Sequence, residues 1–194
     1  MSGGKKRLAI LISGTGTNMT AIIEAAESGV LDADAAVVIS DNPNAKGLVR
    51  AAKMGYETIA CPYAKGLPRE ENEQAVIKAI KERDIDWIVL AGFMRVLSPS
   101  FVKEFRGRIV NIHPALLPAF PGARAIRDAI EAGAEVTGVT IHIVDELVDH
   151  GPIIAQREVP ILPGDTEETL AMRIHETEHE LYPRMLQELI NEDV

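Results

Sequence analysis

The feature that most constrains the fold of this chain is a repeated alternation of short apolar runs with segments of helical periodicity. The first unit is an apolar run from Arg7 to Ile12, a glycine-rich turn at 13–18, and apolar residues that recur at helical spacing from Met19 to Val30. The same order recurs along the first half of the chain. Alternation of this kind predicts a parallel sheet wrapped by helices, so the sequence indicates an α/β fold.

The second half of the chain continues this pattern and then changes it. The predicted strands are 7–12, 35–40, 57–60, 86–91, 108–112, 137–144 and 153–159, and the predicted helices are about 19–30, 46–54, 69–83, 125–132 and a final helix after 165. Apolar and polar residues alternate in 137–144, which indicates a strand with one fully buried face. We expect at least one of the last two strands to be antiparallel, and therefore a mostly parallel, mixed sheet.

Length and composition fit one globular domain. The 194 residues predict a single domain over 1–194, with a flexible N-terminus at about 1–6. The formal net charge of −9 disfavours nucleic acid and anionic membranes as partners. A single cysteine excludes an intramolecular disulfide and a cysteine cluster for metal. No apolar run approaches the roughly 18 residues of a membrane helix, so we expect a cytoplasmic protein.

The most informative local pattern is the pair Asn111 and His113, which stand two residues apart at the end of an apolar run that Pro114 stops. Residues i and i+2 of a strand project to the same face, so the amide and the imidazole can reach one point in space. Two N–H donors held near a strand end can stabilise the negative charge that develops on a carbonyl oxygen under attack. The alternative is that both residues cap the strand and its turn.

Two further segments have the composition of binding loops. The turn at 13–18 offers backbone N–H groups at a helix N-terminus, which suit a phosphate, although it lacks the lysine of a Walker loop and the third glycine of a dinucleotide fingerprint. The loop at 92–99 is apolar apart from Arg95 and follows a buried strand, which suits a ligand pocket. The alternatives are a tight turn without a ligand and ordinary packing against the next helix.

Two carboxylates stand out by their positions. Asp149 lies in a polar loop between the last two strands, where it could hold an imidazole protonated and relay a proton, or be an ordinary solvated residue. Glu178 interrupts an apolar stripe of the final helix, where a carboxylate is costly to bury without a partner. Either this helix faces a cleft there, or Pro183 breaks its register. The remaining histidines are His142, His150, His175 and His179. They lack metal-ligand spacing, so no metal site is predicted, and we interpret them as surface or packing residues.

Five blocks of the sequence, in this order, resemble the folate-dependent glycinamide ribonucleotide formyltransferases. They read SGTGTN, LAGFMRVLS, IVNIHPALLPAFPG, VDELVDHGPIIAQ and ETEHELYP, and the resemblance runs from about Arg7 to about Glu188. It implies a single-domain, Rossmann-like formyltransferase fold with helices on both faces of the sheet. It also implies transfer of the formyl group of 10-formyltetrahydrofolate, a co-substrate, to the amine of glycinamide ribonucleotide in de novo purine biosynthesis. No metal is implied, the partners are these small molecules, and the oligomeric state, monomer or homodimer, stays open.

The resemblance also implies roles for individual residues. It implies a catalytic trio of Asn111, His113 and Asp149, a phosphate turn of Gly16, Thr17 and Asn18, and a carboxylate, Glu178, that receives the substrate amine. It implies that Met94, Arg95, Val96 and Leu97 form a folate pocket, in which backbone groups hydrogen-bond the pteridine. It also implies that Arg69 is a basic residue near the anionic ends of the ligands. The implied mechanism is direct attack of the amine on the formyl carbon, with an Asn/His oxyanion site and an aspartate that assists proton transfer.

Two departures from the family pattern concern the loop after the His-Pro pair. Many relatives have Ser where this chain has Ala115, so any hydroxyl contact there is lost. Relatives often have His after the Pro-Gly pair, where this chain reads Ala123 and Arg124. Contacts from this loop to the ligands are therefore left open.

Three other functions stay open at this point. A formyltetrahydrofolate deformylase would use the same trio with water as the acceptor, but usually carries an N-terminal regulatory domain. A methionyl-tRNA formyltransferase would need a further C-terminal domain with a basic surface, whereas this chain is acidic. A non-catalytic nucleotide-binding module would keep the phosphate turn alone.

Overall fold

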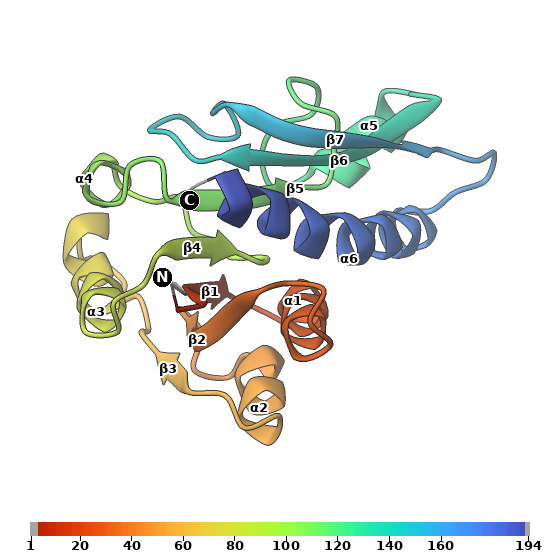
Figure 1. The fold of residues 1–194 in the computed structure, drawn as a ribbon. Helices are drawn as coiled ribbons and strands as arrows, with labels where there is room; N and C mark the ends of the chain where they lie inside the picture. The colour runs from red at the N-terminus through yellow and green to blue at the C-terminus, as the bar shows by residue number, and fades with distance from the viewer. Residues whose placement is uncertain (1–3, 193–194) are drawn as a thin grey trace.

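The computed structural model describes residues 4–192, in which one seven-stranded sheet is covered by helices on both faces (Figure 1). The strands are β1 (Lys6–Ile12), β2 (Ala33–Ser40), β3 (Thr58–Ala60), β4 (Trp87–Leu90), β5 (Ile109–His113), β6 (Val136–Ile143) and β7 (Ile153–Pro160). The helices are α1 (Thr17–Glu27), α2 (Lys46–Lys53), α3 (Arg69–Lys81), α4 (Pro99–Glu104), α5 (Ala125–Glu131) and α6 (Glu167–Glu192). The α/β class predicted from the sequence is confirmed.

The sheet is mixed, with the order β3-β2-β1-β4-β5-β6-β7. Strands β3, β2, β1, β4 and β5 run parallel, whereas β5 pairs with β6, and β6 with β7, in antiparallel register. Both of the last two strands are therefore antiparallel to their neighbours. For β6 and β7 this follows from their connection, residues 144–152, which is too short for the crossover that a parallel pair needs. The expectation of a mostly parallel, mixed sheet is confirmed.

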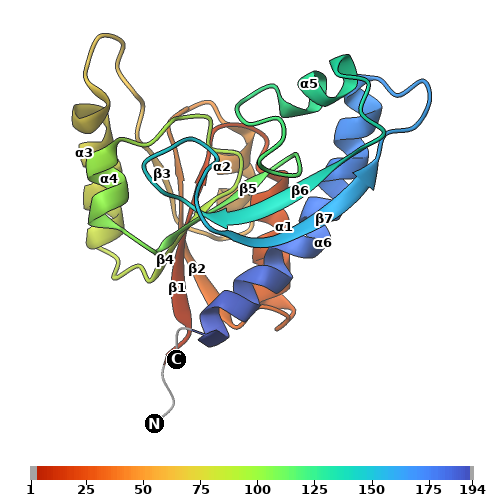
Figure 2. The ribbon, with the colours of Figure 1, turned by 90° about the horizontal axis from the view of Figure 1, so that it is seen from above.

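The helices divide between the two faces of the sheet. Helices α1, α2 and α6 lie on one face and α3 and α4 on the other, as Figures 1 and 2 show. Each face has its own apolar cluster: one is built around Ile10, Ile22 and Leu186, and the other around Leu11, Ile80 and Phe101. Successive residues of β1 thus point into different clusters, as the alternation of side chains along a strand requires.

The structure sets the boundaries of two regions that the sequence patterns did not define, helix α4 and the start of β1. Helix α4 is too short to show apolar periodicity, and its start is fixed by Ser98, whose side chain accepts a hydrogen bond from the Phe101 N–H, with Pro99 at the first helical position. Of the N-terminal stretch expected to be flexible, residues 1–3 lie outside the described residues, and Lys6 already belongs to β1.

Helix α6 is continuous through Pro183, so the proline does not break its register. Glu178 is buried in the same stripe as Ile174 and Leu181, with 4% of its surface exposed, so the stripe keeps its register with a carboxylate inside it. Next to it, Tyr182 is completely buried, and its hydroxyl lies 3.0 Å from the Leu90 carbonyl oxygen and 3.1 Å from that of Val110. Tyr182 therefore fastens α6 to β4 and β5.

Replacing Tyr182 by Phe tests this attachment. The change keeps the ring but leaves two buried carbonyl oxygens without their shared donor, so we expect a loss of about 1–3 kcal/mol in the free energy of unfolding, measured by urea titration. Tyr56→Phe is the matched control, because its hydroxyl donates to Glu27 at the surface and should be worth at most about 0.5 kcal/mol. Equal losses in the two variants would contradict the assigned role of Tyr182.

Candidate functional site

The candidate site lies where the carboxyl ends of β1, β4 and β5 meet at one edge of the sheet. After β1 the chain continues toward β2, and after β4 it continues toward β5, so the two connections leave in opposite directions. Such a switch in strand order opens a crevice at the carboxyl ends of the strands. The two turns are joined there by a hydrogen bond of 2.9 Å from the Ser13 N–H to the Gly92 carbonyl oxygen.

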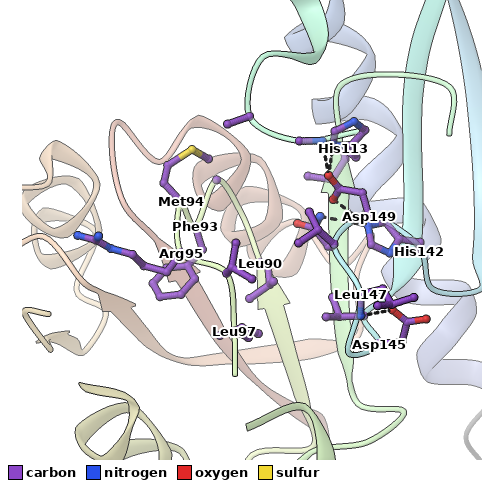
Figure 3. Close-up of a pocket in the computed structure, with 18 of the residues that line it drawn as sticks. Leu90, Phe93, Met94, Arg95, Leu97, His113, His142, Asp145, Leu147 and Asp149 are labelled. Carbon is purple, nitrogen blue, oxygen red and sulfur yellow. Dashed lines mark hydrogen bonds and ion pairs between the residues drawn. The ribbon is translucent and has the colours of Figure 1, made fainter. Parts of the chain in front are cut away.

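Asn111 and His113 stand at this edge on β5. The His113 residue is 4% exposed, and its two ring nitrogens have different partners. Nδ1 lies 3.4 Å from Oδ2 of Asp149 (Figure 3). Nε2 lies 2.8 Å from the Phe120 carbonyl oxygen. A ring that donates from both nitrogens, as an imidazolium does, fits a carboxylate on one side and a carbonyl on the other.

Asp149 reaches this histidine from the loop between β6 and β7, which folds back over β5. Its backbone has a left-handed φ of 50°, and its side chain is only 12% exposed, so it is not an ordinary solvated loop residue. Oδ2 also accepts a hydrogen bond of 2.8 Å from the Gly122 N–H. The segment 120–122 therefore holds both members of the pair, through a carbonyl to His113 and an amide to Asp149.

His142, which the sequence pattern assigned to the surface or to packing, belongs to the site. It lies directly opposite Asn111 in the β5–β6 register, and it is 2% exposed. Burial lowers the pKa of His142, which favours a neutral ring. Nδ1 then donates to the Ile143 carbonyl oxygen at 3.1 Å, and Nε2, at 3.2 Å, can accept from the Asn111 Nδ2. One of the two amide hydrogens of Asn111 thus has an internal partner, and the other is left for a ligand.

The pairing of β5 with β6 is the information that would have placed His142 in the site. Cross-strand neighbours share a face of the sheet, so a histidine opposite Asn111 points to the same side. The polar positions of the run 137–144 are visible in the sequence, but the register of β6 on β5 is not.

A cavity of about 270 Å³ opens beside these residues. One wall is the β4–α4 loop (residues 92–98), and the opposite wall is the β6–β7 loop, so that Figure 3 shows Met94 and Leu97 across the cavity from Leu147 and Asp145. Asn111, His113 and Asp149 line its inner end. The predicted pocket residues Met94, Arg95, Val96 and Leu97 all line the cavity. A mainly apolar cavity with a few convergent polar groups is typical of a small-molecule site.

The glycine turn forms a second part of the site, next to but outside this cavity. Gly16 has a left-handed φ of 71° and precedes α1, and among the described residues no side chain caps this helix. The N–H groups of its first turn therefore remain available for an anion. Gly47 is required for the same turn: its N–H donates to the Gly14 carbonyl oxygen, and an added Cβ would lie 2.4 Å from Ile12.

Glu178 and Asn18 connect helix α6 to this turn. The Asn18 Nδ2 donates to Oε2 of Glu178 at 2.8 Å, and both side chains are buried. Burial raises the pKa of Glu178, against the smaller opposing effects of the Asn18 hydrogen bond and of His175. The Asn18 Oδ1 is buried without a hydrogen-bond partner among residues 4–192. A buried carboxylate and an unpaired amide oxygen side by side suit a ligand that donates hydrogen bonds, such as an amine or a hydroxyl.

Three positions that the sequence analysis raised do not line the cavity: Arg69, Ala115 and Arg124. Arg69 is outside the cavity, in a neighbouring hollow with Lys65 and Arg95, and its Nη1 is 3.5 Å from the Val96 carbonyl oxygen. Ala115 is buried, and its carbonyl oxygen accepts the hydroxyl of Thr140. Arg124 extends into solvent and pairs with Asp128 at 3.6 Å.

Two features are absent from residues 4–192, a metal-binding cluster and a membrane-spanning helix. Within this range, no group of three or more His, Cys, Asp or Glu side chains is arranged to hold a metal ion. None of the helices in the same range is both long enough and apolar enough to cross a bilayer.

Comparison with known proteins gives one family over nearly the whole chain. The model of the formyl transferase family matches residues 6–186. The phosphoribosylglycinamide formyltransferase of Bacillus subtilis is 40% identical over 185 residues, which cover 95% of this chain and 95% of that protein. The trifunctional purine biosynthetic protein adenosine-3 of Drosophila melanogaster is 46% identical over 98% of this chain, which spans only 14% of that protein.

Solved structures agree with this result. The crystal structure of phosphoribosylglycinamide formyltransferase from Bacillus halodurans matches with a TM-score of 0.92 and 47% sequence identity, over 97% of both chains. Glycinamide ribonucleotide transformylase 1 from Symbiobacterium toebii matches with a TM-score of 0.95 and 41% identity, over 98% of this chain and 90% of that one. With the family model, the fold and the grouped polar residues in agreement, this chain belongs to the formyl transferase family.

Proposed function

We propose that this chain transfers the formyl group of 10-formyltetrahydrofolate to the amine of glycinamide ribonucleotide, as a single catalytic domain in the cytoplasm. The observation that carries the proposal is the grouping of Asn111, His113 and Asp149 at the inner end of an apolar cavity, beside an uncapped helix N-terminus. The names of the bacterial relatives support the same reaction. Purine biosynthesis is the pathway in which this reaction would act.

The proposed reaction begins with attack of the substrate amine on the formyl carbon. The carbonyl oxygen becomes negatively charged and is stabilised by the free amide hydrogen of Asn111 and by the imidazolium of His113. Because the Nε2–H of His113 points at the Phe120 carbonyl oxygen, the oxyanion must compete with that carbonyl for the same donor. Asp149 stabilises the imidazolium and assists the transfer of a proton from the attacking amine to the departing folate nitrogen, through water.

Each ligand has a matching surface in this arrangement. The apolar cavity between the β4–α4 and β6–β7 loops suits the folate ring, with backbone groups of Arg95, Val96 and Leu97 as its hydrogen-bonding partners. The uncapped turn at Gly16 suits the ribonucleotide phosphate. Glu178, next to Asn18, suits the amine of the substrate. The attacking nitrogen then comes from the turn side and the formyl carbon from the cavity side.

Substituting the two oxyanion donors tests the mechanism. Loss of one such donor costs about 100- to 1000-fold in turnover, so we expect a fall of that size in kcat for Asn111→Ala and at least as much for His113→Ala. Asp149→Asn should also lower kcat, because it removes the charge 3.4 Å from Nδ1 of His113. Near-normal kcat in the first two variants, with unfolding curves like those of the wild type, would rule out the proposed oxyanion site.

An absorbance assay with 10-formyltetrahydrofolate, with and without glycinamide ribonucleotide and with products identified by mass, tests the reaction itself. Release of tetrahydrofolate together with a formylated ribonucleotide, only when the acceptor is present, is the expected result. Release without the acceptor would identify a deformylase instead. Binding of the ribonucleotide without any turnover would identify a non-catalytic module.

The role of His142 is to hold the amide of Asn111 in one orientation, and two substitutions test it. His142→Phe removes the acceptor for the amide, so we expect kcat to fall by between about 10- and 100-fold, with smaller changes in both KM values. His142→Gln retains an acceptor oxygen and should recover part of the loss. Equal activity in the Phe and Gln variants would mean that the ring fills space only.

Because the carboxyl of Glu178 is buried, we expect Glu178→Gln to raise stability at neutral to alkaline pH and to lower activity. Its raised pKa means that the folded protein holds this proton more tightly than the unfolded chain, so the carboxyl stabilises the fold at low pH, and this contribution is lost as the pH rises toward the folded-state pKa. Glu178→Gln removes this dependence and keeps an acceptor for Asn18. We expect its Tm, relative to that of the wild type, to be higher at about pH 8 than at about pH 4, while activity falls.

Glu180→Gln is the control for this comparison. Glu180 lies two residues further along α6, is 65% exposed in its side chain, and pairs with Arg157 at the surface. Its substitution should change Tm little at either pH. A Tm difference between Glu178→Gln and wild type that is the same at both pH values would contradict the inferred burial effect.

A further inference from the structure

A chain of three side-chain contacts connects the turn after β1 with the β4–α4 loop. The Ser13 hydroxyl donates to Oδ1 of Asp41 at 2.5 Å and accepts from the Met94 N–H at 2.8 Å. Oδ2 of Asp41 accepts from Nε of Arg95 at 2.6 Å. Asp41, which directly follows β2, thus reaches the β4–α4 loop twice, once directly at Arg95 and once through Ser13 at Met94.

The contacts of Asp41 are those of a fixed carboxylate. Its side chain is 4% exposed, and each oxygen has its own donor. A buried carboxylate is tolerated when its oxygens are paired and hydrogen-bonded in this way. One donor, Arg95, belongs to the β4–α4 loop, and the other, Ser13, accepts from the Met94 N–H of the same loop. Both oxygens of Asp41 are therefore linked to that loop.

The consequence for the cavity is seen at Arg95. Its guanidinium lies over the Tyr63 ring, 5.3 Å from the ring centroid, and Figure 3 shows this side chain directed away from His113 and Asp149. With the cation held on the outer side of the loop by Asp41 and Tyr63, the polar groups that residues 94–97 can offer a ligand are those of their backbone, because the other side chains of this segment are apolar.

The other end of the same loop is fixed separately. Glu73, on α3, is completely buried, and it accepts hydrogen bonds from both the N–H and the hydroxyl of Ser98. Residues 94–97 are therefore held between two buried carboxylates, Glu73 at the α4 end and Asp41 at the β4 end. A loop held at both ends presents its backbone groups to a ligand with little loss of conformational entropy on binding.

We propose that Asp41 is a positioning residue for folate binding, which acts through Ser13 and Arg95 to hold the β4–α4 loop in its binding conformation. Asp41 is not among the residues that line the cavity, so it acts through these two partners. The inference rests on the proposed function for the identity of the ligand, and it adds a residue that neither apolar periodicity nor the resemblance singled out.

The first test is the kinetics of Asp41→Asn. An asparagine keeps one acceptor oxygen but turns an N–H group toward Ser13 or Arg95, so one contact to the loop is lost. We expect KM for 10-formyltetrahydrofolate to rise about tenfold, which corresponds to about 1.4 kcal/mol, with kcat and KM for the ribonucleotide within about twofold of wild type. The dissociation constant of tetrahydrofolate, measured by calorimetry under reducing conditions, should rise in parallel.

A matched pair at Ser13 tests the indirect route. Ser13→Ala removes the acceptor of the Met94 N–H, whereas Ser13→Thr keeps a hydroxyl at the same place. We expect the weaker folate binding of Asp41→Asn to appear in Ser13→Ala and to be largely restored in Ser13→Thr. Equal tetrahydrofolate affinities in the Ala and Thr variants would overturn the route through Ser13.

The control for stability is Asp165→Asn. Asp165 is another carboxylate paired with an arginine, Arg173 at 2.8 Å, with 6% of its side chain exposed, but it lies outside the cavity. Its substitution should lower stability without a change in folate affinity. If Asp41→Asn lowers only Tm, or weakens both substrates equally, as a general loss of structure would, the proposal is overturned.

The outcomes for the two proposals are distinguishable. Calorimetry with tetrahydrofolate needs no formyl acceptor, so weaker binding in Asp41→Asn supports the positioning role whichever acceptor the enzyme uses. A wild type that binds tetrahydrofolate but does not formylate the ribonucleotide overturns the proposed function alone. A wild type that does not bind tetrahydrofolate overturns both.

Discussion

The pairing of β1 with β4 is the constraint on which the rest of the site depends. These two strands are neighbours in the sheet but distant in the chain, and the segments that leave them diverge toward β2 and β5. Parallel pairing brings both carboxyl ends to one edge, where the Ser13 N–H bonds the Gly92 carbonyl oxygen. The turn at 13–18 and the β4–α4 loop are therefore adjacent before any side chain is considered.

The antiparallel end of the sheet supplies the remaining groups. The β5–β6 pairing sets His142 opposite Asn111, and the β6–β7 loop folds back so that Asp149 meets His113. The loop that carries Asp149, residues 144–152, joins the antiparallel strands β6 and β7. A parallel pair would need a longer crossover connection, so the antiparallel pairing of β6 with β7 is what places this short polar loop beside the site.

Buried carboxylates recur around this site, each with a defined set of donors. Glu178 faces Asn18, Asp41 faces Ser13 and Arg95, and Glu73 faces Ser98. Burying a carboxylate costs free energy unless its oxygens are satisfied, so such groups contribute less to stability than an apolar side chain of the same size would. Their role in this fold is orientation, because they connect the turn, the loop and the helix that surround the candidate site.

The sequence by itself determined the α/β class, the succession of strands and helices apart from the short α4, and the pair Asn111 and His113, because these follow from periodicities of one residue with its near neighbours. The resemblance to a family gave expected roles to Asp149, the turn at 13–18 and the β4–α4 loop, which the residues alone had left open. Only the tertiary structure decided which side chains meet across the sheet: His142 with Asn111, Asp41 with Arg95, and Asn18 with Glu178. Such contacts join residues far apart in the chain, and their partners are set by the order of strands in the sheet and by their register, which local sequence patterns do not encode.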